Sequence, residues 1–378
     1  MADMKRNVYI MYAIALLQGM VFYGPIATLY RQAQGVSVFQ ITAIESVSLF
    51  LCIILEVPWG VVADKIGYKK TMVFCSWLYL ISKLVFWQAS GFGGFLLERV
   101  MLSFVIAGLS GVDSSILFLS SKGLNSQKVF GIYYGLGTAG MLAAAALFSV
   151  CIGDNYRLAA FATVISYGLA ALLALGLEEV KKEQQEKFDK KAFRQLLSSV
   201  LKDKRLLLML LTIALFQECH QTITVFLNQL QYEKVGLSSS AIGIVFIAVT
   251  LVGLLGMLSH RVTKALGSKK SGLTLILLGF LACLCLAITE TAVFSVGAIV
   301  LLRLSYTLFE PLHMELQNRQ IKSEYRATAL SINSMMINSV AIGTNLLFGS
   351  LAQLNLRAAF AFGAVACASA LIMFLKTT

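Results

Sequence analysis

Apolar runs of about twenty residues recur along the whole chain, and they decide what it can fold into. Of the 378 residues, 58% are hydrophobic and only 13% are charged, and the mean hydropathy is +0.79. A soluble domain carries about 25% charged residues, so this chain has too little polar surface to cover soluble domains. We therefore expect a membrane protein whose spans are helices, because lipid offers backbone groups no hydrogen-bond partner.

Twelve such runs can be delimited in the sequence. They cover residues 7–30, 37–62, 70–89, 94–120, 128–152, 156–177, 205–230, 239–262, 270–289, 292–317, 326–352 and 356–375. The one long charged stretch lies between the sixth and the seventh run. We expect an N-terminal six-helix bundle at 1–177, a cytoplasmic linker at 178–204 and a C-terminal six-helix bundle at 205–378.

Lysine and arginine divide unevenly between the two sides of the expected spans. With the N-terminus inside, 24 of the 31 fall in inner segments and four in outer ones, among them Arg31, while Lys83, Arg99 and Arg303 lie within spans. Cytoplasmic connections carry such an excess, so both termini are expected to be cytoplasmic. The net charge of +12 thus reflects helix ends facing the cytoplasm, and we expect no nucleic-acid partner.

The two halves resemble each other at a fixed spacing. Ile14-Ala-Leu-Leu-Gln18 recurs as Ile213-Ala-Leu-Phe-Gln217, and Gly67-Tyr-Lys-Lys70 recurs as Gly267-Ser-Lys-Lys270. Both pairs occupy corresponding places in their halves. Internal repeats of this kind are typical of membrane transporters.

The connection between the second and third runs carries a recognisable spacing of glycines and charges. Its members are Gly60, Asp64, Lys65, Gly67, Lys69 and Lys70. This spacing resembles motif A of the major facilitator superfamily, although Tyr68 stands where that motif usually has arginine. The resemblance implies two pseudo-symmetric six-helix bundles, alternating access, and an inner gate that Asp64 holds shut by docking at the start of the eleventh span.

Two further stretches bear on the branch of the family. Arg326-Ala-Thr-Ala-Leu-Ser331 looks like a run found in many bacterial exporters, and Arg99 is similar to an arginine of proton-coupled members. The chain is thus nearest to bacterial drug–proton antiporter-like exporters. The fifth span departs from that branch, because it has glycines from Gly131 to Gly140 but no Gly-Pro pair.

Charged residues inside spans are candidates for proton coupling, because inserting one at the centre of a helix costs about 2.5–3.5 kcal/mol. The candidates are Glu218, Arg303, Glu310 and Asp113. Glu218 and Arg303 are expected at similar depth and therefore as a pair. Glu45 and Arg99 form a second expected pair.

Polar and aromatic residues at helical spacing mark the expected substrate cavity. They are Gln18, Tyr23, Glu45, Arg99, Gln217, Gln221, Asn228, Tyr306, His313 and Asn338. Such stripes either line a cavity or hold helices together, and for the eleventh span both readings stand. The seven cysteines show no metal-ligand spacing, so no metal and no cofactor is expected.

These observations favour a secondary active transporter of the cell membrane, such as a bacterial inner membrane, and not an enzyme. We expect a monomer that exports a small amphipathic molecule in exchange for protons. The alternative is a proton- or solute-coupled importer of a sugar or similar nutrient. A transporter of metals or metal chelates and a receptor without transport are less favoured.

Overall fold

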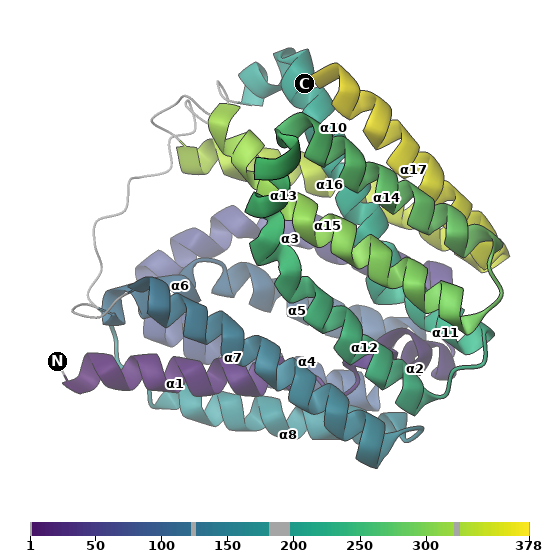
Figure 1. The fold of residues 1–378 in the computed structure, drawn as a ribbon. Helices are drawn as coiled ribbons and strands as arrows, with labels where there is room; N and C mark the ends of the chain where they lie inside the picture. The colour runs from purple at the N-terminus through teal and green to yellow at the C-terminus, as the bar shows by residue number, and fades with distance from the viewer. Residues whose placement is uncertain (1, 122–125, 181–196, 321–325, 378) are drawn as a thin grey trace. The chain divides into compact units, whose positions relative to one another are not determined.

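The computed structural model describes residues 2–121, 126–180, 197–320 and 326–377. In these ranges the regular structure is helical and contains no strand (Figure 1). The expected all-α class is therefore confirmed. A helix pairs every interior backbone group within one segment, as apolar surroundings demand.

Helices follow one another along the first half of the chain. They are α1 (Ala2–Gly19), the 3-10 turn η1 (Gly24–Ile26), α2 (Ala27–Ala33), α3 (Val38–Ile66), α4 (Tyr68–Gln88), α5 (Gly91–Leu109), α6 (Val112–Ser120), α7 (Ser126–Leu147), the π-helical turn η2 (Phe148–Ile152) and α8 (Tyr156–Leu175).

A similar series of helices follows in the second half of the chain. They are α10 (Lys204–Gln221), the π-helical turn η3 (Thr222–Leu227), α11 (Asn228–Lys234), α12 (Ser239–Gly253), the 3-10 turn η4 (Leu254–Leu258), α13 (Ser259–Leu266), α14 (Ser268–Ile288), α15 (Ala292–Gln320), α16 (Arg326–Leu354) and α17 (Leu356–Thr377).

The repeat expected from short sequence matches extends through both halves. The helices α4 and α14 cover 68–88 and 268–288, an offset of 200 residues. Neighbours correspond as well: α4 packs against α5 and α8, and α14 packs against α15 and α17. Gly67 and Gly267 precede these helices with φ of 96° and 79°, a conformation that side chains with a Cβ rarely adopt.

Four expected spans are interrupted helices. The span at 7–30 breaks at η1, and the span at 205–230 passes through the π-helical turn η3 at the corresponding point of the second half. The span at 94–120 breaks at Gly111, whose φ of 80° ends α5 and starts α6. The span at 239–262 passes through η4. A continuous apolar run in the sequence does not reveal such breaks.

Eleven helices among the described residues are long and apolar enough to cross a membrane. The segment expected as the third span is the helix α4, but it is not one of the eleven. Lys69, Lys70 and Lys83, together with several aromatic and hydroxyl residues, lower its hydropathy. The expected count of twelve spans is therefore not confirmed, and the cytoplasmic placement of both termini stays a prediction.

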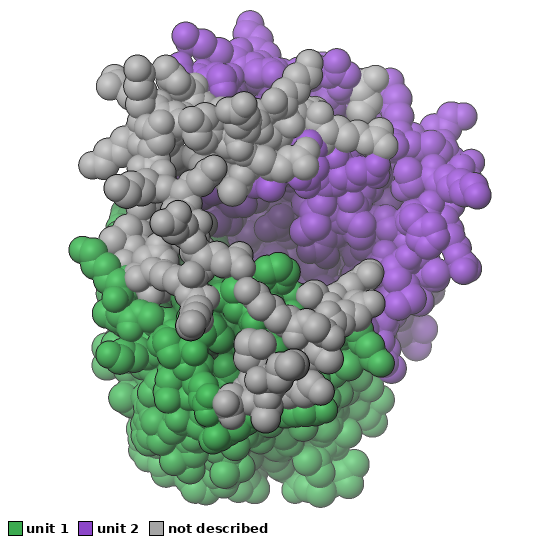
Figure 2. Space-filling view, turned by 90° about the vertical axis from the view of Figure 1, so that its left-hand side faces the viewer, with its two compact units in different colours: residues 1–36, 47–184, 239–247 green, residues 37–46, 185–238, 248–378 purple. Residues whose placement is uncertain are grey.

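The chain forms two compact units, coloured differently in Figure 2. Unit 1 consists of residues 1–36, 47–184 and 239–247, and unit 2 consists of residues 37–46, 185–238 and 248–378. Unit 1 thus includes the first residues of α12, and unit 2 includes the first residues of α3. The rest of each of these helices belongs to the other unit. The domain boundaries expected at 177 and 205 stay a prediction.

Glycine lets α1 and α7 approach closely within unit 1. A Cβ added to Gly140 on α7 would overlap the carbonyl oxygen of Leu16 on α1. A Cβ added to Gly135, five residues earlier on α7, would meet no atom within 4 Å. Small residues allow helix backbones to touch, and Gly140 has this role here.

Replacing Gly140 with alanine should destabilise unit 1, because the methyl group must push α1 and α7 apart. Overpacking of this kind costs about 1–3 kcal/mol. Thermal unfolding of the detergent-purified protein should show a lower Tm for Gly140→Ala and no loss for Gly135→Ala. Since both changes remove a helical glycine, equal Tm values for the two variants would contradict the close contact.

Candidate functional site

Unit 1 buries a cluster of ions where α2, α4 and α5 come together. Lys83 Nζ lies 3.4 Å from Glu98 Oε1 and donates to the hydroxyl oxygen of Tyr23 at 2.9 Å. Arg31 Nη2 lies 3.9 Å from Glu98 Oε2. All four side chains are buried, and Glu98 is 1% exposed. Two cations therefore share one carboxylate, and the cluster carries one net positive charge while Tyr23 is neutral.

Aromatic rings surround both cations of this ion cluster. The guanidinium of Arg31 lies 5.4 Å from the ring centroid of Phe86 and 5.9 Å from that of Phe95. The ammonium of Lys83 lies 5.5 Å from the centroid of Tyr167. The negative face of a ring attracts a cation by about 0.5–2 kcal/mol, more when water is excluded. The rings therefore offset part of the cost of burying more cations than anions.

The ion cluster was not expected in this form. Successive residues of a helix project about 100° apart, so Glu98 faces Lys83 and Arg31 while Arg99 faces elsewhere. Arg31, counted above with an outer connection, is 8% exposed and lies inside the first candidate span. The signal in the sequence was Lys83, a cation inside a span that requires an acid nearby. The pairing of Glu45 with Arg99 stays a prediction.

Unit 2 places a carboxyl group in a hydrogen-bonded chain. The Thr222 hydroxyl donates to Glu218 Oε1 at 2.6 Å and lies 3.1 Å from Asn345 Oδ1. A hydroxyl has one proton, so it cannot donate to both oxygens. With the Asn345 amide turned over, its NH2 group, which otherwise has no partner, donates to Thr222 and Thr222 donates to Glu218. Glu218 is 5% exposed and has no cation within 4.0 Å among the described residues.

A second polar group lies on a different face of α10. Arg303 Nη1 is 3.2 Å from His220 Nε2, and the rings of His220 and Tyr306 stack with centroids 4.3 Å apart. The guanidinium has only donors, so His220 Nε2 must accept and the imidazole must be neutral with its proton on Nδ1. Thr224 Oγ1, 3.3 Å from the same nitrogen, is then a second donor.

Arg303 thus contacts His220 and not Glu218, which differs from the expected pair. Residues two apart on a helix project about 200° apart, so Glu218 and His220 meet different neighbours. The side chain of Arg303 packs so closely on Gly253 that a Cβ there would lie 2.6 Å from Nη2.

The other expected cavity and coupling residues differ in their surroundings. Tyr306, His313 and Asn228 are buried, Gln18, Glu45, Arg99, Gln217 and Asn338 are half-buried, and Gln221 and Glu310 are exposed. His313 Nδ1 lies 3.3 Å from Gln317 Nε2. Asp113 accepts from the Ser114 amide at 2.7 Å and from the Tyr133 hydroxyl at 3.4 Å. Their roles in binding and coupling stay predictions.

The connection expected to act as a gate is described in part. Lys65 and Lys70 are exposed and Lys69 is half-buried. The surroundings of Gly60 and Asp64 lie outside what the structure describes. The carboxylate of Glu179 accepts from the amides of Tyr68 and Lys69 at 2.9 and 3.2 Å. Glu179 therefore satisfies orphan donors at the start of α4, a role the sequence did not suggest. Docking of Asp64 stays a prediction.

A helical chain with buried charges inside apolar spans has the architecture of a multi-pass membrane transporter. The model of the Major Facilitator Superfamily matches residues 8–343. The chain therefore belongs to the Major Facilitator Superfamily, and the expected membership is confirmed. No curated protein sequence matches this chain.

Several solved structures share this fold at low sequence identity. A mutant of the nucleoside transporter NupG has a TM-score of 0.84 and 16% identity, over 98% of this chain and 99% of that one. The D-xylose–proton symporter has a TM-score of 0.75 and 12% identity, over 99% and 97% of the two chains. A bacterial homologue of the human lysosomal transporter Spinster has a TM-score of 0.70 and 15% identity, over 100% and 95%.

Removing the carboxylate of the ion cluster should destabilise the protein strongly. Glu98→Gln removes the carboxylate that Lys83 and Arg31 both contact, and breaking a buried pair costs about 3–5 kcal/mol. A matched control is Glu290→Gln, which breaks the exposed pair with Arg357 and should cost no more than about 1 kcal/mol. Thermal unfolding in detergent compares the two variants.

The double variant Glu98→Gln, Lys83→Met distinguishes loss of the ion pair from disruption of side-chain packing. It also removes the ammonium group that Glu98 pairs with, so it should regain part of the Tm lost by Glu98→Gln alone. A Tm for Glu98→Gln equal to that of Glu290→Gln would show that the ion cluster contributes nothing to stability.

Proposed function

We propose that this chain is a proton-coupled secondary transporter that moves a small polar organic solute into the cell by alternating access. Its membership of the Major Facilitator Superfamily establishes transport as the class of activity. The coupling ion, the solute and the direction are the proposal. The observation that carries it is the surroundings of Glu218.

Glu218 has what a proton-binding group requires. Its carboxyl is almost fully buried and accepts a hydrogen bond from Thr222. Gaining or losing a proton there changes the local charge by one unit, and no described cation lies within ion-pair distance to cancel that change. The π-helical turn η3 begins at Thr222, and single π-turns inside helices often lie at functional sites.

Arg303 supplies the second half of the proposed coupling. Here its guanidinium contacts neutral His220, which bears no charge to hold it. An ionised Glu218, two residues before His220 on α10, offers a stronger partner than a neutral imidazole. We infer that Arg303 turns from His220 to Glu218 when Glu218 loses its proton, and returns when the proton is regained. Glu310 and Asp113 are secondary candidates for this coupling.

Uptake of a polar solute is favoured over the export first expected from the sequence. The similar folds include a nucleoside transporter and a D-xylose–proton symporter, whose cargoes are polar and rich in hydroxyl groups. The amides of Gln217 and Asn228 and the aromatic ring of Tyr306 suit hydrogen bonding and ring stacking with such solutes. Export of an amphipathic compound by proton antiport remains the second candidate, because residues 326–331 resemble a run of bacterial exporters.

The variant Glu218→Gln tests the coupling. In proteoliposomes with an imposed pH gradient, it should lose concentrative uptake of nucleosides or sugars by at least about tenfold, because glutamine cannot carry the proton. Exchange of solute for solute without a gradient should persist, since binding does not require the proton to move. The control Glu233→Gln removes an exposed carboxylate of α11 and should transport normally.

Two outcomes would contradict the proposal. Concentrative uptake by the double variant Glu218→Gln, Arg303→Gln would show that the two residues only stabilise the bundle. Accumulation under the opposite pH gradient, with protons leaving as solute enters, would replace symport by antiport and favour the export reading.

A further inference from the structure

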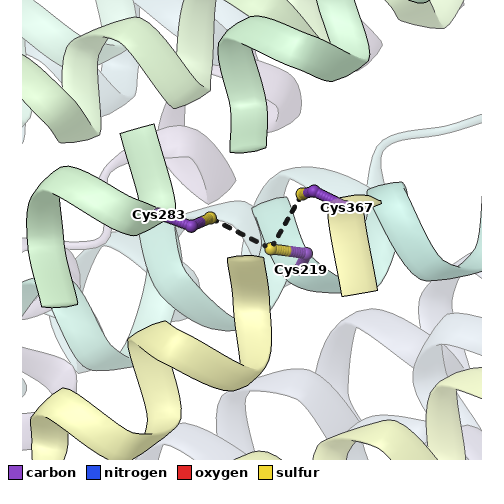
Figure 3. A group of neighbouring side chains, drawn as sticks. All are labelled: Cys219, Cys283 and Cys367. Carbon is purple, nitrogen blue, oxygen red and sulfur yellow. Dashed lines mark hydrogen bonds between the residues drawn. The ribbon is translucent and has the colours of Figure 1, made fainter. Parts of the chain in front are cut away.

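Three helices of unit 2 bring three thiols together, although their cysteines are far apart in sequence. Cys219 on α10, Cys283 on α14 and Cys367 on α17 point toward one another (Figure 3). The sulfur of Cys219 lies 3.4 Å from that of Cys283 and 3.6 Å from that of Cys367, and all three sulfurs lie within 4.8 Å of one another. Each of the three residues is 0% exposed.

We propose that these three sulfurs form a trigonal binding site for one thiophilic monovalent cation, Cu(I) or its analogue Ag(I). Metal–sulfur bonds of about 2.3 Å in a trigonal plane set the sulfurs about 4.0 Å apart. Two of the separations, 3.4 and 3.6 Å, are slightly shorter than this value and the third is no more than 4.8 Å, so small rotations about the Cα–Cβ bonds suffice to admit the ion. The spacing in the sequence gave no hint of the site, because each ligand comes from a different helix.

The ligand set selects the kind of cation. Soft sulfur ligands favour Cu(I) over hard cations such as Mg²⁺. Zinc in structural sites takes four ligands, whereas the described His, Cys, Asp and Glu residues offer three here, and full burial leaves no place for water as a fourth. A thiol must lose its proton to ligate a metal ion, so binding of the cation releases protons from the cluster to solvent.

Gly363 on α17 gives the cluster the room that this site needs. A Cβ added there would lie 3.2 Å from the sulfur of Cys219 and 3.4 Å from that of Cys283. The Cys219 thiol also lies 3.5 Å from the carbonyl oxygen of Gly363. A glycine at this point therefore leaves two of the three sulfurs free to adjust around an ion.

The internal repeat provides an independent argument. Subtracting the offset of 200 from Cys283 and Cys367 gives Lys83 and Tyr167, which lie on α4 and α8 in unit 1. There the ammonium of Lys83 lies 5.5 Å from the ring centroid of Tyr167. The corresponding helix contact of unit 1 thus buries a positive charge, that of the Lys83 ammonium. At the matching positions unit 2 has the thiols of Cys283 and Cys367.

Silver binding to the full-length, detergent-purified protein tests the proposal without any transport assay. Ag(I) is added in chloride-free buffer, unbound metal is removed by gel filtration, and bound silver is measured by mass spectrometry. Incubation is long, because buried thiols need a local opening before the ion can enter. A variant with the other four cysteines, Cys52, Cys75, Cys151 and Cys285, replaced by serine should retain one silver ion per chain and a higher Tm when loaded.

Two variants make the result decisive. Replacing Cys219, Cys283 and Cys367 with serine in the wild-type chain should abolish the tightly bound silver ion. The matched control Cys75→Ser, which removes a buried cysteine of unit 1, should leave that ion bound. Gly363→Ala in the variant that retains only the three thiols should weaken binding at least about tenfold. The proposal is overturned if the variant that retains only the three thiols binds no silver. It is also overturned if adding Gly363→Ala to that variant leaves its affinity for silver unchanged.

Discussion

A charge or polar group inside a lipid-facing bundle finds neither water nor a counter-ion, so each helix must obtain its partners from its neighbours. This constraint explains the buried polar contacts in both units. Unit 1 places Glu98 between Lys83 and Arg31 and lines the cations with aromatic rings. Unit 2 links Glu218 to Thr222 and Asn345 and holds Arg303 against His220. A change in the protonation of Glu218 therefore acts first on its contact with Thr222.

The two units use one scaffold for different chemistry. Helices α4 and α14 match at an offset of 200 residues and have corresponding neighbours, yet one carries Lys83 and the other Cys283 at the same position. Unit 1 has a permanent ion cluster whose loss should cost stability. Unit 2 has the buried carboxyl of Glu218 without a described counter-ion, and our proposal assigns proton coupling to this group. A repeat that preserves helix packing leaves such side chains free to diverge.

The sequence predicted the helical class, the family and the position of most helices, because apolar length and helix-end charge are local properties. It did not predict the breaks at Gly111 and at η3, which depend on backbone conformation inside an unbroken apolar run. Pairing was the weakest inference. Whether Glu98 or Arg99 faces Lys83 depends on helix rotation, and three cysteines on three helices meet only through tertiary packing.

The movement of protons with the solute tests the central claim most directly. In proteoliposomes without an imposed gradient, adding a transported nucleoside or sugar should make the external medium more alkaline, because each solute carries a proton inward. The same addition to Glu218→Gln proteoliposomes should leave the external pH unchanged. Solute entry through the wild-type protein with no change in pH, or with acidification of the medium, would contradict proton-coupled uptake through Glu218.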